Sequence, residues 1–332
     1  MRGRGGRGSV VQSRHGFGNS LIGLINRIGA VWVAVIGLYV VSGAISPAMF
    51  QIGQVLNILQ VAAFLGVIAC GQTLVLLAGG IDLSQAGVVT LVNIVAAEIM
   101  GGHAANIPAA VAACVLLALA VGVGNAITVT RLGVTPLIAT LGMNAILYGG
   151  ALVYTGGAPH GGIAGAFAGI GAGSVLGLPS ATLIWLALSA AVAWITRATA
   201  FGRALYAAGA NPVAAHLVGV PVARTIGIAY VGASLLAGAG GLLITSYIGA
   251  PSLGIGEQFT LTSVAAVVIG GTALSGGIGS VVATVGGAIF VTELASFTTI
   301  ARISTGMQYV AQGALIALSV LAYRAVARAR AA

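Results

Sequence analysis

The four acidic residues are the side chains of this sequence with the clearest capacity for chemistry. Asp82 follows two glycines and precedes Ser84, so its carboxylate could cap a helix that begins just after it. Glu293 lies within a long apolar run, and inside a membrane an ionisable group is costly and indicates a functional site by default. Glu98 and Glu257 lie nearer the ends of apolar runs, where water at the membrane surface can solvate their charges. Asp82 is therefore a candidate either for a structural cap or for a residue of a substrate path or gate.

No catalytic arrangement is apparent in the sequence. All 13 basic residues are arginine, so the lysine of a phosphate-binding GxxxxGK[ST] loop is absent. No nucleophile is accompanied by a plausible base and orienting group. Cys70 and Cys114 lie in apolar runs that indicate buried small hydrophobes, and the histidines lack metal-ligand spacing. We therefore expect no metal and no cofactor, and if ATP drives this protein, its hydrolysis takes place on another chain.

The composition indicates which elements position these residues. Only 5% of the 332 residues are charged and 59% are hydrophobic, whereas about 25% of a soluble domain is charged. Such a chain has too little polar surface to cover a core in water, which predicts an all-α polytopic membrane protein. The 53 glycines suit membrane helices that pack closely or contain breaks.

Ten apolar stretches of about 17–25 residues are candidate membrane spans. If the N-terminus is cytoplasmic, 12 of the 13 arginines lie on the cytoplasmic side and only Arg302 lies outside, which is a strong positive-inside bias. This bias supports both the even number of spans and the orientation. The Gly-rich loop 154–179 then lies outside and is predicted to be irregular or re-entrant. The ten ranges are 28–46, 54–78, 84–101, 107–130, 136–154, 179–197, 225–248, 258–275, 280–299 and 305–323.

Basic segments flank the predicted transmembrane domain of residues 28–323. Residues 1–27 are predicted to form a cytoplasmic tail, and residues 324–332 form a second one. The N-terminal arginines and glycines resemble an RNA-binding segment, but membrane spans follow at once. We therefore expect the tail to be attracted to the anionic lipid of the bilayer and not to nucleic acid. It lacks the features of a secretory signal.

A short helix is predicted in the cytoplasmic loop of residues 198–224. Asn211 is a good N-cap because its side chain can accept hydrogen bonds from free backbone amides. Pro212 follows at the first helical position, where its missing N–H costs nothing. Gly219 suits a left-handed C-terminal cap, and Pro221 prevents continuation. The enclosed helix, residues 212–218, is about 10 Å long and cannot span a membrane.

This short helix is mostly apolar and would be marginal alone in water. Either the rest of the chain covers it, or a groove on a partner accepts it. Small side chains at Ala214 and Ala215 would allow a partner to approach closely.

The stretch GRALYAAGANPVAAHLVGVPV resembles the cytoplasmic docking loop of ABC importer permeases of the ribose, xylose and galactose type. In that family a G-x-N-x-x-A-A-x-x-x-G pattern forms a coupling helix that inserts into the ATP-binding subunit. Three further stretches resemble family signatures in the same order, and the resemblance covers most of residues 20–323. They are LLAGGIDLS (76–84), GNAITVTRLGVTPLIATLGM (124–143) and VVIGGTALSGGIGSVVATVGGAIF (267–290).

The sequence departs from the family pattern at several positions. Pro212 stands where an acidic residue is frequent, His216 where arginine is frequent, and Ile278 where a basic residue is frequent. Gln85 and Ala86 replace a Val-Gly pair. These departures leave the class unchanged and bear on which ATPase and which substrate the protein binds.

The resemblance implies a permease subunit of a bacterial ABC importer, with the type II architecture of the vitamin B12 importer. Two permease chains would form the channel in the cell (inner) membrane, with both termini cytoplasmic. An extracytoplasmic binding protein would deliver a monosaccharide such as ribose. The ATP-binding subunit would dock on Gly209, Asn211, Pro212, Ala214, Ala215, Leu217 and Gly219.

Sugar passage would require hydrogen-bonding groups along a path between the helices. Most of the candidates could equally form helix–helix hydrogen bonds. They are Asp82, Ser84, Asn57, Asn93, Asn144 and Thr272, with Gln60, Gln72 and Asn125 as further possibilities.

Other functions stay open at this point. A related ABC permease could carry nucleosides, branched-chain amino acids or a signalling furanose. A secondary transporter would couple to ions through buried acids, for which Asp82 and Glu293 are the plausible ones. A membrane enzyme lacks a catalytic set. The pattern GGxxLS occurs twice, 191 residues apart at Gly79 and Gly270, and reflects either a structural repeat or chance.

Overall fold

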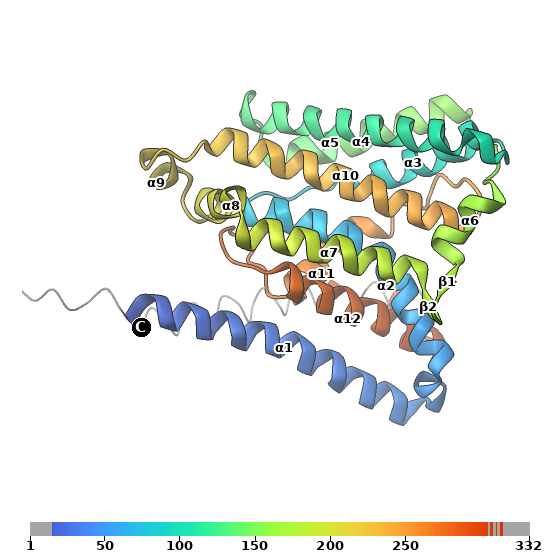
Figure 1. The fold of residues 1–332 in the computed structure, drawn as a ribbon, viewed down its shortest axis with the longest axis horizontal. Helices are drawn as coiled ribbons and strands as arrows, with labels where there is room; N and C mark the ends of the chain where they lie inside the picture. The colour runs from blue at the N-terminus through green and yellow to red at the C-terminus, as the bar shows by residue number, and fades with distance from the viewer. Residues whose placement is uncertain (1–14, 305, 308–309, 311–312, 315–332) are drawn as a thin grey trace, which may run out of the picture.

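Helices form almost all of the regular structure in the part of the chain that is described. The computed structural model describes residues 15–304, 306–307, 310 and 313–314, with side chains from residue 29 onward. The long helices run roughly side by side (Figure 1). In chain order the elements are α1 (His15–Ile45), η1 (Pro47–Phe50), α2 (Ile52–Leu77), α3 (Gln85–Met100), η2 (Ala104–Asn106), α4 (Ile107–Thr130), α5 (Pro136–Thr155), α6 (Gly165–Ala172), β1 (Ser174–Val175), β2 (Leu178–Pro179), α7 (Ser180–Ala198), α8 (Ala200–Ala210), α9 (Pro212–Leu217), α10 (Val222–Ile248), α11 (Phe259–Ile269) and α12 (Val281–Ile300).

The described helices confirm the prediction of an all-α membrane protein. Six helical segments are long and apolar enough to cross a membrane, and three shorter apolar helices accompany them. The first nine predicted spans each overlap one of these, whereas most of the tenth, 305–323, lies outside the described residues. Helix α1 begins at His15, so it includes part of the predicted N-terminal tail. The six long segments are Ile52–Leu77, Ala104–Thr130, Pro136–Thr155, Ser180–Ala198, Val222–Ile248 and Val281–Ile300.

Two of the predicted spans are helices of reduced length. Helix α11 has 11 residues, or about 16 Å, although the sequence predicts a span to residue 275. It ends early because Gly271 adopts the left-handed conformation, φ +84°, which stops a helix. Helix α3 has 16 residues, or about 24 Å. Both are shorter than the roughly 30 Å hydrocarbon layer, so each begins or ends inside the thickness that the longer helices span.

The repeated GGxxLS pattern forms the same local structure twice. Gly79 after α2 and Gly271 after α11 both have φ +84°. The next N–H donates five residues back in each case, from Gly80 to the Val75 carbonyl at 2.9 Å and from Thr272 to Val267 at 3.2 Å. The structure therefore pairs Gly79 with Gly271, whereas the sequence pattern pairs Gly79 with Gly270.

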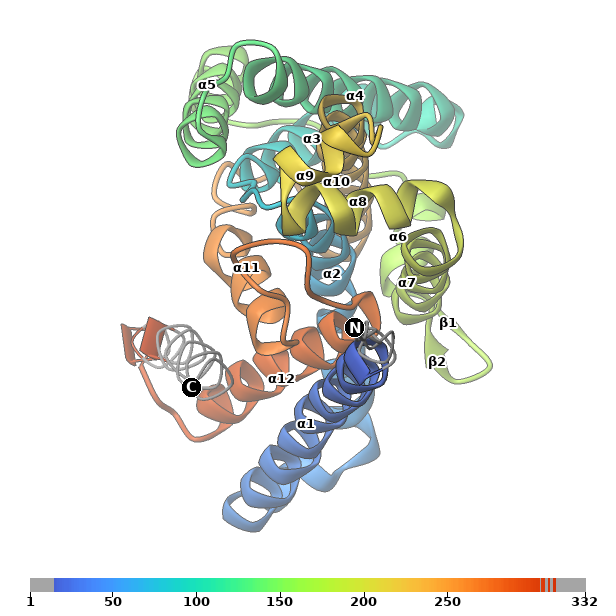
Figure 2. The same cartoon turned by 90° about the vertical axis from the view of Figure 1, so that its left-hand side faces the viewer.

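Helix α2 lies at the centre of the fold. In its most apolar window 83% of residues are buried, against 22% for α5, so α2 is a core helix and α5 lies at the periphery. Helix α10 packs on α4, α2 and α3, while α2 also contacts α12, α7 and α11, an arrangement visible end-on in Figure 2. Trp185 of α7 is fully buried and fits because a Cβ on Gly66 would lie 2.1 Å from its ring.

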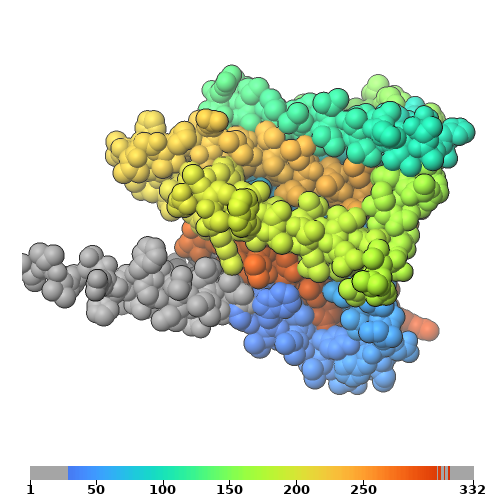
Figure 3. Space-filling model, in the orientation of Figure 1, coloured from blue at the N-terminus to red at the C-terminus, as the bar shows by residue number. Residues whose placement is uncertain are grey.

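The two ends of the helical layer carry different structures. The short helices α8 and α9 lie at one end, and α6 and the β1–β2 hairpin lie at the opposite end (Figures 1 and 3). The hairpin pairs Ser174 with Pro179 and Val175 with Leu178, and positive φ at Leu176 and Gly177 closes its turn. Of the loop 154–179, residues 156–164 are irregular as predicted, whereas α6 and this hairpin give the remainder a local order that the sequence analysis did not predict.

Candidate functional site

Helix α9 has the caps that the sequence predicts. Asn211 Oδ1 accepts hydrogen bonds from the N–H groups of Val213 at 3.1 Å and Ala214 at 3.0 Å, and Pro212 occupies the first turn. Gly219 has φ +84°. The helix ends at Leu217, one residue before the predicted end. Its conformation is thus fixed by local chemistry at both ends.

A second helix, α8, leads directly into α9, and the sequence analysis missed it. Thr199 caps it, since the Thr199 hydroxyl accepts from the Gly202 N–H at 3.2 Å. Leu205 is buried and Arg203 is exposed, which is the amphipathic pattern that could have indicated this helix. The cytoplasmic loop of the prediction is therefore a pair of short helices.

Most of α9 is uncovered by the rest of the chain. Val213, Leu217 and Val218 are 70%, 81% and 79% exposed, whereas Ala215 is only 4% exposed. The sequence left open whether the rest of the chain or a partner covers this helix. The rest of the chain covers only the side that carries Ala215. The other side presents three large apolar side chains.

Two residues of the predicted docking set face inward. Ala215 packs inside the chain, so of the two alanines only Ala214 is exposed. Gly209 is also buried, and a Cβ there would lie 1.8 Å from the Leu77 carbonyl oxygen. Neither can form a surface for a partner in this structure. The exposed members of the set are Asn211, Pro212, Ala214, Leu217 and Gly219.

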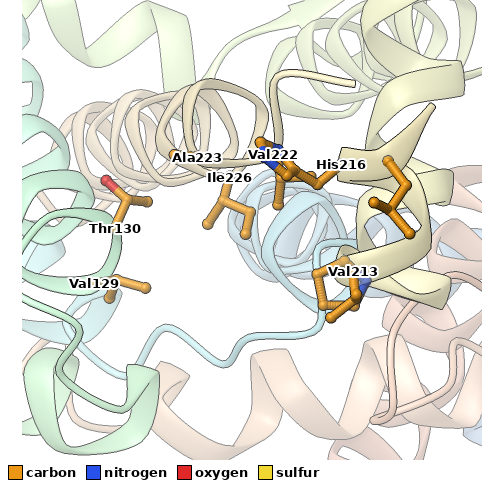
Figure 4. Close-up of a pocket in the computed structure, with 9 residues that line it drawn as sticks. Val129, Thr130, Val213, His216, Val222, Ala223 and Ile226 are labelled. Atoms are coloured by element: carbon orange, nitrogen blue, oxygen red, sulfur yellow. The ribbon is translucent and has the colours of Figure 1, made fainter. Parts of the chain in front are cut away.

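An apolar cavity that is open to the surface lies between α9, α4 and α10, and the exposed Val213 and Leu217 contribute to its lining. It has a volume of about 510 Å³, and side chains of all three helices face it (Figure 4). Thr130 and His216 are the polar side chains of its wall. A second cavity, of about 310 Å³, shares three lining residues with it and reaches Gly80 and Tyr230. A hollow therefore extends from α9 toward the break that follows α2.

That break, residues 78–84, contains Asp82 in a buried position. Asp82 is 1% exposed, and its Oδ1 accepts from the Ser84 N–H at 2.9 Å and the Ser84 hydroxyl at 2.6 Å. The amide of Gln72, in the orientation that satisfies both its groups, donates to the Asp82 carbonyl at 3.0 Å and accepts from the Asp82 N–H at 3.3 Å. The carboxylate thus fixes the turn that precedes α3. It does not cap the helix as the sequence predicts, because Ser84 is the N-cap residue and no side chain caps the first turn of α3.

Polar side chains of α4 and α5 extend this cluster. Asn125 Nδ2 donates to the Ser84 hydroxyl at 2.8 Å, and Asn144 Oδ1 accepts from the Gly87 N–H at 2.8 Å. The structure therefore brings together Asp82, Ser84 and Asn144 with Gln72 and Asn125, two of the further possibilities that the sequence offers. Three buried oxygen atoms around them have no partner among the described residues, namely Asp82 Oδ2, Asn125 Oδ1 and the Tyr230 hydroxyl.

The remaining predicted path residues lie elsewhere. Asn57 is exposed on α2. Asn93 is buried and binds the Thr245 hydroxyl, the Ala250 carbonyl and the Ser252 N–H, at 2.7–3.2 Å, so it fixes the loop after α10. Gln60 binds the Gly171 carbonyl at 2.9 Å. Thr272 is buried against Gly279, and the structure does not join it to the Asp82 cluster.

The other acids differ in their surroundings. Glu257 is exposed and Glu98 is half-buried, which agrees with their predicted solvation. Glu293 is 2% exposed, and neither carboxyl oxygen has a partner within the described part of the chain. No group of three or more His, Cys, Asp or Glu side chains that could hold a metal occurs among the described residues.

Comparison with known proteins identifies the class. A family model described as "Branched-chain amino acid transport system / permease component" matches residues 54–320. The ribose import permease RbsC of Escherichia coli K12 is 34% identical over 293 residues, covering 87% of this chain and 91% of the relative. The chain belongs to this permease family. As a permease component it is a transport subunit and not an enzyme.

Further relatives of this permease are sugar permeases by name. RbsC of Bacillus subtilis is 32% identical over 311 residues, covering 90% of this chain and 93% of the relative. The galactose/methyl galactoside import permease MglC of Haemophilus influenzae is 29% identical over 314 residues, covering 89% and 92%. No solved structure matches the permease.

Replacing Asn211 by alanine is expected to loosen α9 of the permease. The change removes the acceptor of two backbone N–H groups, which costs about 1 kcal/mol of helix stability. Amide hydrogen exchange at residues 213–217 should accelerate by about fivefold, since 1.4 kcal/mol corresponds to tenfold. Asn211→Asp keeps the acceptor and should exchange like the wild type. Equal exchange in all three proteins would contradict the capping role.

Proposed function

We propose that this permease is the transmembrane subunit of a bacterial ATP-driven ABC importer that carries a monosaccharide such as ribose. The observation that carries the proposal is α9, a capped helix whose side chains Val213 and Leu217 are exposed, followed directly by the exposed Val218. Three such apolar side chains on and just after a short helix at one end of the fold call for a partner groove. The ribose and galactose permeases among its relatives support a sugar as the substrate.

The partner on α9 is an ATP-binding subunit in this proposal. Exposed arginines, Arg131, Arg203 and Arg224, lie in the segments next to α9. The four acidic residues of the chain lie elsewhere, at positions 82, 98, 257 and 293. The groove that receives α9 is therefore expected to be apolar with an acidic rim.

The proposed arrangement in the membrane has ten spans, the type II architecture and both termini in the cytoplasm. The positive-inside distribution of arginine supports this orientation in the inner membrane. A second permease chain completes the channel, and an extracytoplasmic binding protein delivers the sugar. The regions are a tail at 1–27, the permease domain at 28–323 and a tail at 324–332.

The buried cluster around Asp82 is the proposed part of the substrate path. It offers hydroxyl, amide and carboxylate groups from the α2–α3 break, α4, α5 and α10. Sugars bind through many neutral hydrogen bonds, which suits these groups. Unpaired oxygens such as Asn125 Oδ1 and Tyr230 hydroxyl are available to a ligand that reaches them.

Branched-chain amino acids form the second candidate substrate class, because the matching family model carries that description. Nucleosides are a further option for the same fold. An ion-coupled secondary transporter is the candidate from another class, with Asp82 and Glu293 as its buried acids.

Uptake by reconstituted vesicles tests the proposal. The permease, the ATPase that co-purifies with it and its binding protein are placed in proteoliposomes with radiolabelled D-ribose, D-galactose, L-leucine or a nucleoside. We expect uptake of one sugar that requires hydrolysable ATP and is unchanged when ionophores remove ion gradients. Uptake driven by an ion gradient without any ATPase would replace this function by secondary transport, and uptake of leucine alone would replace the sugar.

A further inference from the structure

Three turns that are far apart in the sequence meet beside α9. They are the end of α2 at Leu77 to Gly80, the end of α8 at Gly209 and Ala210, and the turn between α11 and α12 at Gly276 and Gly277. The Gly277 N–H donates to the Leu77 carbonyl at 3.0 Å. This hydrogen bond joins a residue just before the first GGxxLS segment to a residue just after the second.

Glycine is what allows the three backbones to approach so closely. A Cβ on Gly209 would lie 1.8 Å from the Leu77 oxygen and 2.7 Å from the Gly277 nitrogen. A Cβ on Gly276 would lie 2.7 Å from the Gly209 oxygen and 2.8 Å from Gly79 Cα. Because the neighbours are backbone atoms, they cannot move aside by changing a rotamer. The contact is therefore rigid. We call it the glycine junction, and it consists of residues 77–80, 209–210 and 276–277.

Two side chains strengthen the junction on the side of α12. The Tyr206 hydroxyl of α8 donates to the Gly279 carbonyl at 2.9 Å, and Arg197 at the end of α7 donates to the Ser280 hydroxyl at 3.0 Å. Burial raises the pKa of Tyr206 by more than the nearby Arg197 charge lowers it, so the phenol stays protonated and remains a donor. The α11–α12 turn is therefore fastened to α8.

The two sides of α9 differ in how firmly they are connected. Toward α4 and α10 it faces the cavity of about 510 Å³. In the chain direction it follows α8 through the single residue Asn211, and α8 holds the glycine junction. A displacement of α9 toward α4 and α10 can therefore be taken up by the cavity. A displacement along the chain instead moves α8 and the closely packed backbone of the glycine junction.

We propose that the glycine junction is the mechanical link by which a partner bound to α9 moves the α2–α3 and α11–α12 turns together. This inference rests on the proposed function. The α2–α3 turn continues through Gly80 to Asp82, so movement of the junction reaches the buried polar cluster. Gly209 and Tyr206 are then positioning residues that convert ATPase movement into rearrangement of the path.

Gly209→Ala in the complete transporter tests the link. The added methyl group separates α8 from the end of α2 without changing the exposed side of α9. We expect the ATPase to co-purify as with the wild type and ATP hydrolysis to stay within twofold, while uptake falls at least tenfold. The measured quantity is sugar imported per ATP hydrolysed. Gly227→Ala is the control, because its Cβ would lie at an ordinary 3.5 Å from Ala126, and it should behave like the wild type.

Tyr206→Phe provides a second variant that adds no atoms. It removes the hydrogen bond to Gly279, and uptake per ATP should fall at least threefold. It decides the question if Gly209→Ala does not fold. Wild-type uptake per ATP in the variants that fold would overturn the inference, as would a parallel fall of hydrolysis and uptake. If the wild-type permease binds no ATPase, the proposed function fails instead.

Discussion

Leu217→Arg is expected to abolish co-purification of the ATP-binding subunit while leaving the permease folded. Leu217 is 81% exposed, so the fold loses almost no packing when it is replaced. In the apolar floor of the partner groove, away from its acidic rim, an arginine would be buried without a counter-charge, which is severely unfavourable. We expect affinity to fall at least 100-fold, or about 2.7 kcal/mol, and ATP-driven uptake to fall with it.

The control for this variant is Leu176→Arg. Leu176 is 100% exposed in the β1–β2 turn, at the opposite end of the molecule from α9. It adds the same charge and should leave the complex intact. Ala215→Arg is unsuitable, because Ala215 is 4% exposed and the arginine would disrupt the permease itself. An intact complex with Leu217→Arg would exclude α9 as the docking helix.

Asp82→Ala is expected to cause the largest loss of stability among the polar substitutions in the path. The Ser84 N–H and hydroxyl both donate to the Asp82 carboxylate in a fully buried site, and alanine leaves both without an acceptor. Each buried group left unsatisfied costs about 1–3 kcal/mol. Thermal unfolding in detergent measures the loss, with the exposed Asn57→Ala as a neutral control.

Asp82→Asn separates the hydrogen bonds of Asp82 from its charge. The amide oxygen can still accept from Ser84, so most of the stability lost in Asp82→Ala should return. Uptake by this stable variant then reports whether the charge itself serves transport. A wild-type unfolding temperature for Asp82→Ala would contradict its structural role in the turn before α3 and leave the path role as the explanation of this residue.

The caps of α9 could be predicted from sequence because their chemistry is local. Asn211, Pro212 and Gly219 act on backbone groups a few residues away. The inward side of the same helix could not be predicted, since the burial of Ala215 depends on elements far along the chain. The glycine junction was missed for the same reason, because Leu77, Gly209 and Gly277 meet only in the folded chain.

The roles of the polar candidates could also be predicted only in part. A buried amide in an apolar run is visible in sequence, but the group that it faces is not. Asn144 reaches the start of α3 and joins the Asp82 cluster, whereas Asn93 fastens an end loop. The early end of α11 was missed although the sequence contains a signal for it, since Gly270 and Gly271 form a helix-stop pair and Gly271 adopts the left-handed conformation.

The short helices α3 and α11 give the membrane interior an electric field that its composition does not supply. The N-terminus of a helix carries about half a positive elementary charge and the C-terminus about half a negative one. Because α3 and α11 are shorter than the hydrocarbon layer, the proposed arrangement places the start of α3 at Gln85 and the end of α11 at Ile269 beneath the membrane surface. A chain with only four carboxylates can thereby orient the dipoles of an uncharged solute, and it can do so without the desolvation cost of placing full charges there.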